Sequence, residues 1–192
     1  EQVDLIKRLY RAYPKALRLV DPVMGDGGQG YPTYTQELCD AMGRLADGAD
    51  ILMPNLTEAS ILIGTEYPGQ DLTDPQVDEI LRDLLDLGAK NVVLKGIDRN
   101  DGKLRNYVVN KRDGVDQKKE LAHEKLPFMI HGTGDAFASA LCGAVMAGRS
   151  LPQAAYIAGE FVRNSMVSTR NQPHFEERGV SFELNLKELT DL

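Results

Sequence analysis

The sequence predicts an α/β fold with a mostly parallel central sheet. Short apolar runs of strand length alternate along the chain with longer segments of helical period, which is the pattern of strands joined by crossover helices. The 192 residues are 42% hydrophobic and 27% charged, and they contain no internal repeat or low-complexity tract. We therefore expect one folded domain over residues 1–192.

Four apolar runs have the length and composition of strands. The first three are continuous, which is typical of strands that are buried on both faces of a parallel sheet. The fourth alternates in polarity after the turn residues Asn100-Asp101-Gly102, as an edge or hairpin strand does. The predicted strands are residues 16–20, 51–53, 91–94 and 104–110.

Seven segments predict helices, and several have a recognisable start or stop. Pro14 ends the first helix, Thr35 caps the second, and Pro75 occupies the first turn of the fourth. The charged stretches at residues 111–114 and 118–120 predict exposed loops. The predicted helices are residues 3–13, 35–46, 57–63, 74–88, 135–147, 152–169 and 184–189.

Charge and composition exclude several classes of partner. The net charge is -7 and the basic residues are mixed among acidic ones, so we expect no nucleic-acid partner. No apolar run approaches the roughly 20 residues of a membrane span, and no secretory signal pattern occurs. We therefore expect no membrane partner and a cytoplasmic location. Cys39 and Cys142 are predicted to be buried, reduced thiols.

A glycine-rich turn leads directly into a helix of small residues. Glycine permits positive φ at such a turn and leaves backbone N–H groups open to a ligand. Together with the helix dipole, these N–H groups form an anion hole suited to a transferring phosphoryl group. The predicted anion hole consists of Gly132, Thr133 and Gly134.

Asp135, at the start of this helix, is the candidate catalytic base. A carboxylate here would repel phosphate unless it accepted the proton of a substrate hydroxyl as that oxygen attacks phosphorus. The helix N-terminus keeps Asp135 ionised, and a loose phosphoryl-transfer transition state requires removal of the proton only late. The alternative is that Asp135 is an N-cap, which is the commoner use of aspartate at a helix start.

Two carboxylates follow the first predicted strand in the segment Asp21-Pro22-Val23-Met24-Gly25-Asp26. Ligands of open parallel sheets bind beyond the carboxyl ends of strands, so Asp21 and Asp26 suit a hydrated Mg²⁺ or the orientation of a substrate. The alternative is ordinary turn chemistry, because aspartate and glycine are common turn residues and residues 25–30 predict a glycine-rich loop.

Asn55 and Glu58 follow the second predicted strand in the segment Pro54-Asn55-Leu56-Thr57-Glu58. Both can face one crevice, where Glu58 would orient magnesium-bound waters and Asn55 would contact phosphate or ribose. The alternative is a helix-capping arrangement of Asn55 or Thr57 with an early acidic residue. Lys95, after the third strand, is a candidate contact for a nucleotide phosphate, with capping of the sheet edge as its alternative.

All three motifs follow apolar runs that predict strands. A parallel sheet brings the carboxyl ends of its strands to one edge, so we expect Asp21, Asn55, Glu58 and Asp135 to converge there. The chain contains neither a P-loop nor a Gly-x-Gly-x-x-Gly motif. Its three histidines lack the spacing of metal ligands, and we assign them no catalytic role.

These motifs, in this order, resemble those of pyridoxal kinases and their ribokinase-like relatives. The resemblance covers Val20 to about Gly148 and implies a three-layer α/β/α sandwich. It implies that Asp135 is the catalytic base and that Glu58 acts through magnesium, with Asn55 in the same motif.

The resemblance also assigns residues to the metal and to a flap. It places Asp21 near the metal and the phosphates. It places Asp26 and Tyr34 in a flap that closes over nucleotide and substrate and excludes water. The chain departs from the family at Lys95 and Met53, where relatives often have small hydroxyl residues.

By the same resemblance, we expect phosphorylation of the 5′-hydroxymethyl group of pyridoxal, pyridoxine or pyridoxamine. The implied cofactors are ATP and Mg²⁺, the family allows a monovalent cation such as K⁺, and a homodimer is implied. The chain opens at Glu1 without methionine and without the family's first third, so we expect the C-terminal two thirds of a longer protein.

Two alternative functions stay open at this point. A hydroxymethylpyrimidine kinase of thiamine synthesis shares the fold and the motifs and phosphorylates a similar hydroxymethyl group. A non-catalytic remnant of the fold is the alternative from another class, although Asn55, Glu58 and Asp135 argue against it.

Overall fold

The computed structural model describes residues 1–190, which have an α/β fold divided into two compact units. Unit 1 comprises Glu1–Asp101 and Arg105–Glu120, and unit 2 comprises Gly102–Leu104 and the chain from Leu121 onward. The predicted α/β class is confirmed, whereas a single domain over residues 1–192 stays a prediction. None of the helices within residues 1–190 combines the length and the apolar character that a membrane crossing requires.

The sheet contains five strands, and the pairings among its first three, β1, β4 and β5, are parallel. The strands are β1 (Leu19–Val20), β4 (Ile51–Leu52), β5 (Asn91–Asp98), β6 (Lys103–Asn110) and β7 (Lys119–Glu124). Their order in the sheet is β1-β4-β5-β6-β7. β1 pairs in parallel with β4, where Leu19 lies beside Ile51, and β4 pairs in parallel with β5 through Leu52 and Val92. The apolar residues 51–53 and 92–94 are buried, as parallel pairing requires, whereas Leu17 of the first run is exposed.

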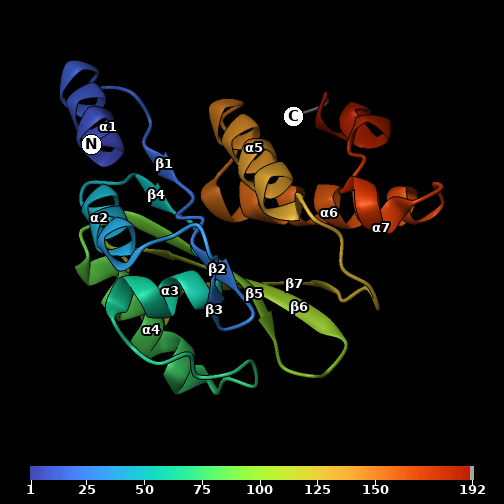
Figure 1. The fold of residues 1–192 in the computed structure, drawn as a ribbon, viewed down its shortest axis with the longest axis horizontal. Coiled ribbons are helices and arrows are strands. Elements are labelled where there is room, and N and C mark those ends of the chain that lie inside the picture. The colour runs from blue at the N-terminus through green and yellow to red at the C-terminus, as the bar shows by residue number, and fades with distance from the viewer. Residues whose placement is uncertain (191–192) are drawn as a thin grey trace. The chain divides into compact units, whose positions relative to one another are not determined.

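Four helices of unit 1 supply about half of the buried residues of its core. They are α1 (Gln2–Ala12), α2 (Gln36–Ala46), α3 (Leu56–Ile63) and α4 (Asp74–Asp86), and a 3-10 helix, η1 (Val115–Gln117), follows β6. Each of the four packs against the next in chain order (Figure 1). Thr35 caps α2 by accepting a hydrogen bond from the Leu38 N–H, as its position predicts. Leu81 and Leu84 of α4 are fully buried, so this helix anchors the core.

A small hairpin follows β1, within the segment that the sequence predicts as a glycine-rich loop. It consists of β2 (Gly25–Asp26) and β3 (Gln29–Gly30), which pair antiparallel. The turn residues Gly27 and Gly28 have φ values of 58° and 82°, the pattern of a type I′ turn that glycine adopts without strain. The glycines therefore form a turn of defined geometry.

Two long helices, α5 (Thr133–Met146) and α6 (Leu151–Arg170), pack against each other in unit 2 (Figure 1). Small buried residues, among them Ala140 of α5 and Ala158 of α6, allow this packing. Pro152 lies in the first turn of α6, which confirms the predicted start. Two shorter elements, α7 (Phe175–Arg178) and the 3-10 helix η2 (Glu183–Leu189), follow α6 in the chain.

Several predicted elements differ from the structure in extent or type. Only Leu19–Val20 of the predicted strand at residues 16–20 pairs with a neighbour. β5 continues to Asp98, so Lys95 lies inside this strand and the prediction that it follows the strand is wrong. The closing helix predicted at residues 184–189 is a 3-10 helix, and α7 was not predicted because four residues are too short to establish a helical period.

β7 replaces the exposed loop predicted at residues 118–120. Lys119 and Glu120 are exposed, as their charge suggests. Glu120 nevertheless accepts hydrogen bonds from Arg105 Nε at 2.8 Å and from the Tyr107 hydroxyl at 3.0 Å, both on β6. The loop prediction was wrong because a run of charges looks the same in a solvated loop and in an exposed strand with cross-strand partners.

We expect Glu120→Ala to lower the free energy of unfolding by about 1–2 kcal/mol, because Arg105 and Tyr107 lose a shared acceptor. Urea denaturation followed by circular dichroism measures the change. Lys119→Ala, on the same strand, is the matched control and should shift the free energy by less than about 0.5 kcal/mol. Equal losses in both variants would contradict the role assigned to Glu120.

Candidate active site

Parallel pairing places three of the predicted site residues together in unit 1. β1 leads directly to Asp21, and β4 leads through Pro54 to Asn55. Lys95 of β5 lies opposite Asn55 in an isolated parallel bridge, and the Lys95 N–H donates to the Pro54 carbonyl at 2.8 Å. The edge at which β1 and β4 end is therefore lined by polar side chains, where parallel sheets bind ligands.

Lys95 and Asp21 form an ion pair that is largely buried. Lys95 Nζ lies 2.6 Å from Asp21 Oδ1, and the two side chains are 13% and 14% exposed. A charged group with so little access to water needs a partner of opposite charge, and here the ammonium and the carboxylate are each other's partner. The sequence allowed two roles for Lys95, a contact to a nucleotide phosphate or a cap at the sheet edge. In the structure it links β5 to the end of β1.

Asn55 and Glu58 form a capping box at the start of α3. The Glu58 N–H donates to Asn55 Oδ1 at 2.8 Å, and the Asn55 N–H donates to Glu58 Oε2 at 2.7 Å. Asn55 Nδ2 donates to the Gly25 carbonyl at 2.8 Å. The capping arrangement left open by the sequence is therefore present. The roles of these two residues toward phosphate and magnesium stay predictions.

The Glu58 carboxyl group is buried, at 3% exposure, beside the ion pair. Burial raises its pKa to about 7, and the nearby Asp21 carboxylate acts in the same direction. The Lys95 ammonium and the hydrogen bond from the Asn55 N–H oppose this shift. A carboxyl group that titrates near neutrality beside a second carboxylate is typical of functional sites.

The β2–β3 hairpin carries the predicted flap residue Asp26. Asp26 Oδ1 accepts a hydrogen bond from the Gly27 N–H at 2.8 Å. Burial raises the pKa of Tyr31, which follows the hairpin, and the carboxylates of Asp26 and Glu58 raise it further. The Tyr31 phenol therefore lies within electrostatic range of both carboxylates.

Tyr31 is a candidate site residue that the sequence interpretation did not name. The interpretation selected Tyr34, whose N–H donates to the Tyr31 carbonyl at 3.0 Å. A signal for Tyr31 was available, because an aromatic residue immediately after a short hairpin is held at its base. The sequence does not show that Tyr31 lies within electrostatic range of these carboxylates.

The glycine turn before α5 has the geometry predicted for an anion hole. Gly132 has a φ of 85° and occupies the N-cap position without a side chain to cap the helix. The N–H groups of Thr133 and Gly134 lie in the first turn, where N–H groups have no intrahelical acceptor. The Val180 N–H donates to the His131 carbonyl at 2.9 Å and holds the turn. Such a turn presents N–H groups and a positive dipole end to an anion.

Asp135 is the third residue of α5, and its side chain is exposed. The N-cap position belongs to Gly132, and no side chain makes the capping hydrogen bond. The alternative interpretation of Asp135 as an N-cap is therefore wrong. Its carboxylate is accessible to a ligand at the positive end of the helix.

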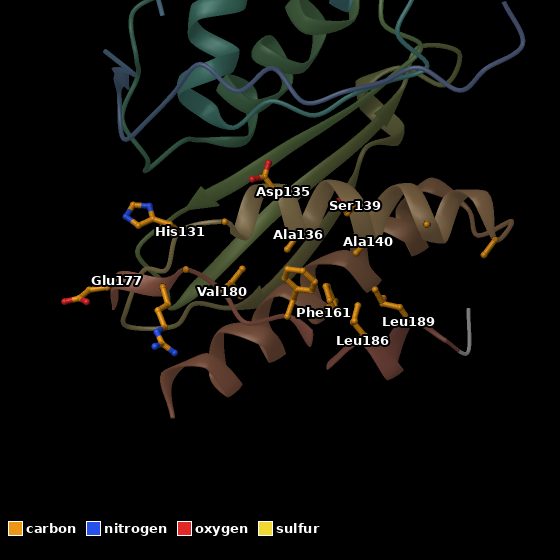
Figure 2. Close-up of a pocket in the computed structure, with 16 residues that line it drawn as sticks. His131, Asp135, Ala136, Ser139, Ala140, Phe161, Glu177, Val180, Leu186 and Leu189 are labelled. Atoms are coloured by element: carbon orange, nitrogen blue, oxygen red, sulfur yellow. The ribbon is translucent and has the colours of Figure 1, made fainter. Parts of the chain in front are cut away.

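A cavity of about 880 Å³ adjoins the first half of α5 (Figure 2). Ala136 and Ala140 of α5 face Phe161 of α6 and Leu186 of η2, so the wall is mainly apolar. Asp135 lies at the end of the cavity where α5 begins. The volume falls in the range of roughly 300–1,000 Å³ of small-molecule sites.

The two groups of candidate residues belong to different units. The structure brings Asp21, Asn55, Glu58 and Lys95 together in unit 1, whereas Asp135 and the anion hole belong to unit 2. The predicted convergence of Asp135 with the residues of unit 1 stays a prediction.

Comparison with known sequences identifies related proteins. A family model described as phosphomethylpyrimidine kinase matches residues 1–178. The chain is similar to a pyridoxine/pyridoxal/pyridoxamine kinase of Bordetella avium, with 30% identity over 169 residues, which cover 86% of this chain and 54% of the relative.

Solved structures show the same fold. A protein of Bacteroides thetaiotaomicron, proposed to be a phosphomethylpyrimidine kinase and solved in an orthorhombic form with pyridoxal, has a TM-score of 0.90 at 30% identity. The match covers 100% of this chain and 67% of that chain. Pyridoxal kinase of Leishmania donovani, in complex with ADP and pyridoxamine, has a TM-score of 0.77 at 26% identity, covering 97% and 62%.

The shared length is only part of these proteins. The chain spans about half the length of the Bordetella relative and about two thirds of the length of the solved structures.

We expect the Glu58 carboxyl group to make stability fall as pH rises from about 4.5 to about 7. Its pKa of about 7 in the folded state exceeds the ordinary value of 4.5, so between these values the folded state retains a proton that the unfolded state has lost. The stabilisation is complete below pH 4.5 and is lost as pH rises through the folded pKa. Urea unfolding across this range, with a chelator present, measures the effect.

Glu58→Gln removes the titration and keeps an acceptor for the Asn55 N–H, so the pH dependence of this variant should be flatter. Glu37→Gln, an exposed residue in the first turn of α2, is the control and should keep the dependence of the original protein. Identical slopes for the original protein and Glu58→Gln would rule out this origin of the pH effect.

Proposed function

We propose that the chain transfers the γ-phosphoryl group of ATP to the 5′-hydroxymethyl group of pyridoxal, pyridoxine or pyridoxamine. The chain belongs to the phosphomethylpyrimidine kinase family, whose model matches residues 1–178. The observation that carries this proposal is the start of α5, where free N–H groups and the Asp135 carboxylate adjoin a cavity. Similarity to the kinases of Bordetella avium and Leishmania donovani supports a B6 vitamer as acceptor and ATP as donor.

Unit 2 supplies the groups for phosphoryl transfer in this proposal. The acceptor oxygen forms a bond to the γ-phosphorus while the bond to ADP breaks, and the hydroxyl proton passes to a carboxylate oxygen of Asp135. The N–H groups of Thr133 and Gly134 donate hydrogen bonds to the phosphoryl oxygens as negative charge develops on them. The apolar wall near Phe161 accepts the nucleotide and excludes water.

The residues of unit 1 fit a hydrated Mg²⁺ bound to nucleotide phosphates. Within residues 1–190, no group of three or more His, Cys, Asp or Glu side chains could hold a metal by itself. Asp21 and Glu58 supply two neighbouring carboxylates, and Mg²⁺ on phosphates needs only one or two carboxylates because it keeps several waters. We assign Asp21 and Glu58 to the ion and Lys95 and Asn55 to phosphate. When bound, Mg²⁺ would neutralise charge on the phosphate oxygens.

Asp135→Asn should lower kcat of the full-length protein by about 10²- to 10⁴-fold, because an amide cannot accept the hydroxyl proton. The KM for ATP should change little, since the N–H groups and the cavity remain. Steady-state assays of ADP release with pyridoxal as acceptor measure both constants. Glu37→Gln, in the first turn of α2, is the matched control. Normal turnover by Asp135→Asn would refute the assignment of the base.

A hydroxymethylpyrimidine kinase is the second candidate. The description of the matching family model and the proposed identity of the Bacteroides protein both favour a pyrimidine alcohol. The phosphoryl-transfer groups described above would serve either acceptor, because both present a hydroxymethyl group on an aromatic ring.

Competition between the two alcohols separates these candidates. With pyridoxal and hydroxymethylpyrimidine at equal concentration and ATP limiting, we expect pyridoxal phosphate as the major product, and the product ratio gives the ratio of kcat/KM. An excess of the pyrimidine phosphate would favour the second candidate. Absence of both products, together with no binding of Mg·ATP in isothermal titration, would refute kinase activity.

A further inference from the structure

A single hydrogen bond ties the tip of the β2–β3 hairpin to α3. The Gly28 N–H donates to Thr57 Oγ1 at 2.8 Å. Thr57 is 4% exposed and directly precedes Glu58 in α3, whereas Gly28 is in the turn of the hairpin. The bond therefore connects the helix that carries Glu58 to the hairpin that carries Asp26.

The hairpin depends on such contacts for its position. Each of its strands has two residues, and an isolated two-stranded hairpin is at best marginally stable in water. Its type I′ turn uses two glycines, which lose the most conformational entropy on ordering. Contacts from the rest of unit 1 must therefore hold the hairpin.

Three contacts hold the hairpin in the structure, and they act at different points. Asn55 Nδ2 donates to the Gly25 carbonyl at the base, 2.8 Å away. The Tyr67 ring lies against Gly28, where an added Cβ would be 2.7 Å from Tyr67 Cδ1. The bond to Thr57 is the polar contact at the tip, where the ring offers only apolar contact.

We infer that Thr57 is a positioning residue whose hydroxyl holds the hairpin, which carries Asp26, against α3, the helix that carries Glu58. This inference rests on the proposed function for its effect on activity, although the contact itself does not. The bond orders the hairpin before a ligand arrives, so less of the binding free energy is spent on ordering it. Loss of the bond should therefore weaken binding more than it slows the chemical step.

Hydrogen–deuterium exchange in the full-length protein without ligands tests the positioning role. The decisive probe is the Tyr31 N–H, which donates to the Met24 carbonyl at 2.8 Å and does not touch Thr57. In Thr57→Val we expect its exchange to be about fivefold faster, the factor expected for loss of one ordinary hydrogen bond. Thr57→Ser keeps the acceptor and should restore the slow exchange.

Ser60→Ala is the matched control, because Ser60 is equally buried in α3 but its hydroxyl donates to the Leu56 carbonyl of the same helix. It should leave the exchange of Tyr31 unchanged. Circular dichroism verifies folding of each variant, and Thr57→Ala provides the same test should Thr57→Val fail to fold.

Steady-state kinetics supply a second measurement. Thr57→Val should raise the KM of the alcohol about tenfold and change kcat less than about twofold, with recovery in Thr57→Ser. Unchanged Tyr31 exchange in Thr57→Val, or equally fast exchange in Thr57→Ser, overturns the inference. Hydrogen exchange is measured without substrates, so it tests the role of Thr57 even if the full-length protein phosphorylates neither alcohol. The absence of phosphorylation would count against the proposed function alone.

Discussion

The charge balance around the ion pair of Lys95 and Asp21 is the interaction on which the rest of unit 1 depends. Two carboxylates, Asp21 and Glu58, share one ammonium group in a region with little water. The cluster is neutral when Glu58 carries a proton and has an excess negative charge when Glu58 is ionised. Burial and the second carboxylate place that transition near neutral pH, so the site can take up either a proton or a cation.

The positions of the two carboxylates are fixed by separate contacts. Lys95 holds Asp21 at the end of β1, and the capping box holds Glu58 at the start of α3, so neither carboxylate is free to turn away. The hairpin is fastened to the same helix, and a change in α3 would therefore reach Glu58 and Asp26 together.

In unit 2, the candidate site is formed by the N-terminus of α5. The glycine at the N-cap leaves the first N–H groups of α5 without a side-chain partner, and Asp135 lies in the first turn of the helix. A carboxylate at that point is exposed to a ligand. Small residues along α5 then leave room for the cavity, because larger side chains there would fill it.

The sequence by itself determined the α/β class, most helix limits and the chemical types at the strand ends. Local rules decide these features: Pro14 ends α1, Thr35 caps α2, and continuous apolar runs mark the strands of the parallel pairings. The motif around Gly132 likewise specifies its own turn, since few residues other than glycine adopt positive φ without strain.

Tertiary structure decided how these residues are used. The pairing of Lys95 with Asp21, 74 positions apart, depends on strand order, and so does the burial that shifts the pKa of Glu58. Packing also determines the cross-strand partners that make residues 119–124 a strand and the contact between Thr57 and Gly28. A linear pattern records residue types and spacing, whereas pairing, burial and electrostatics depend on distances that exist only once the chain has folded.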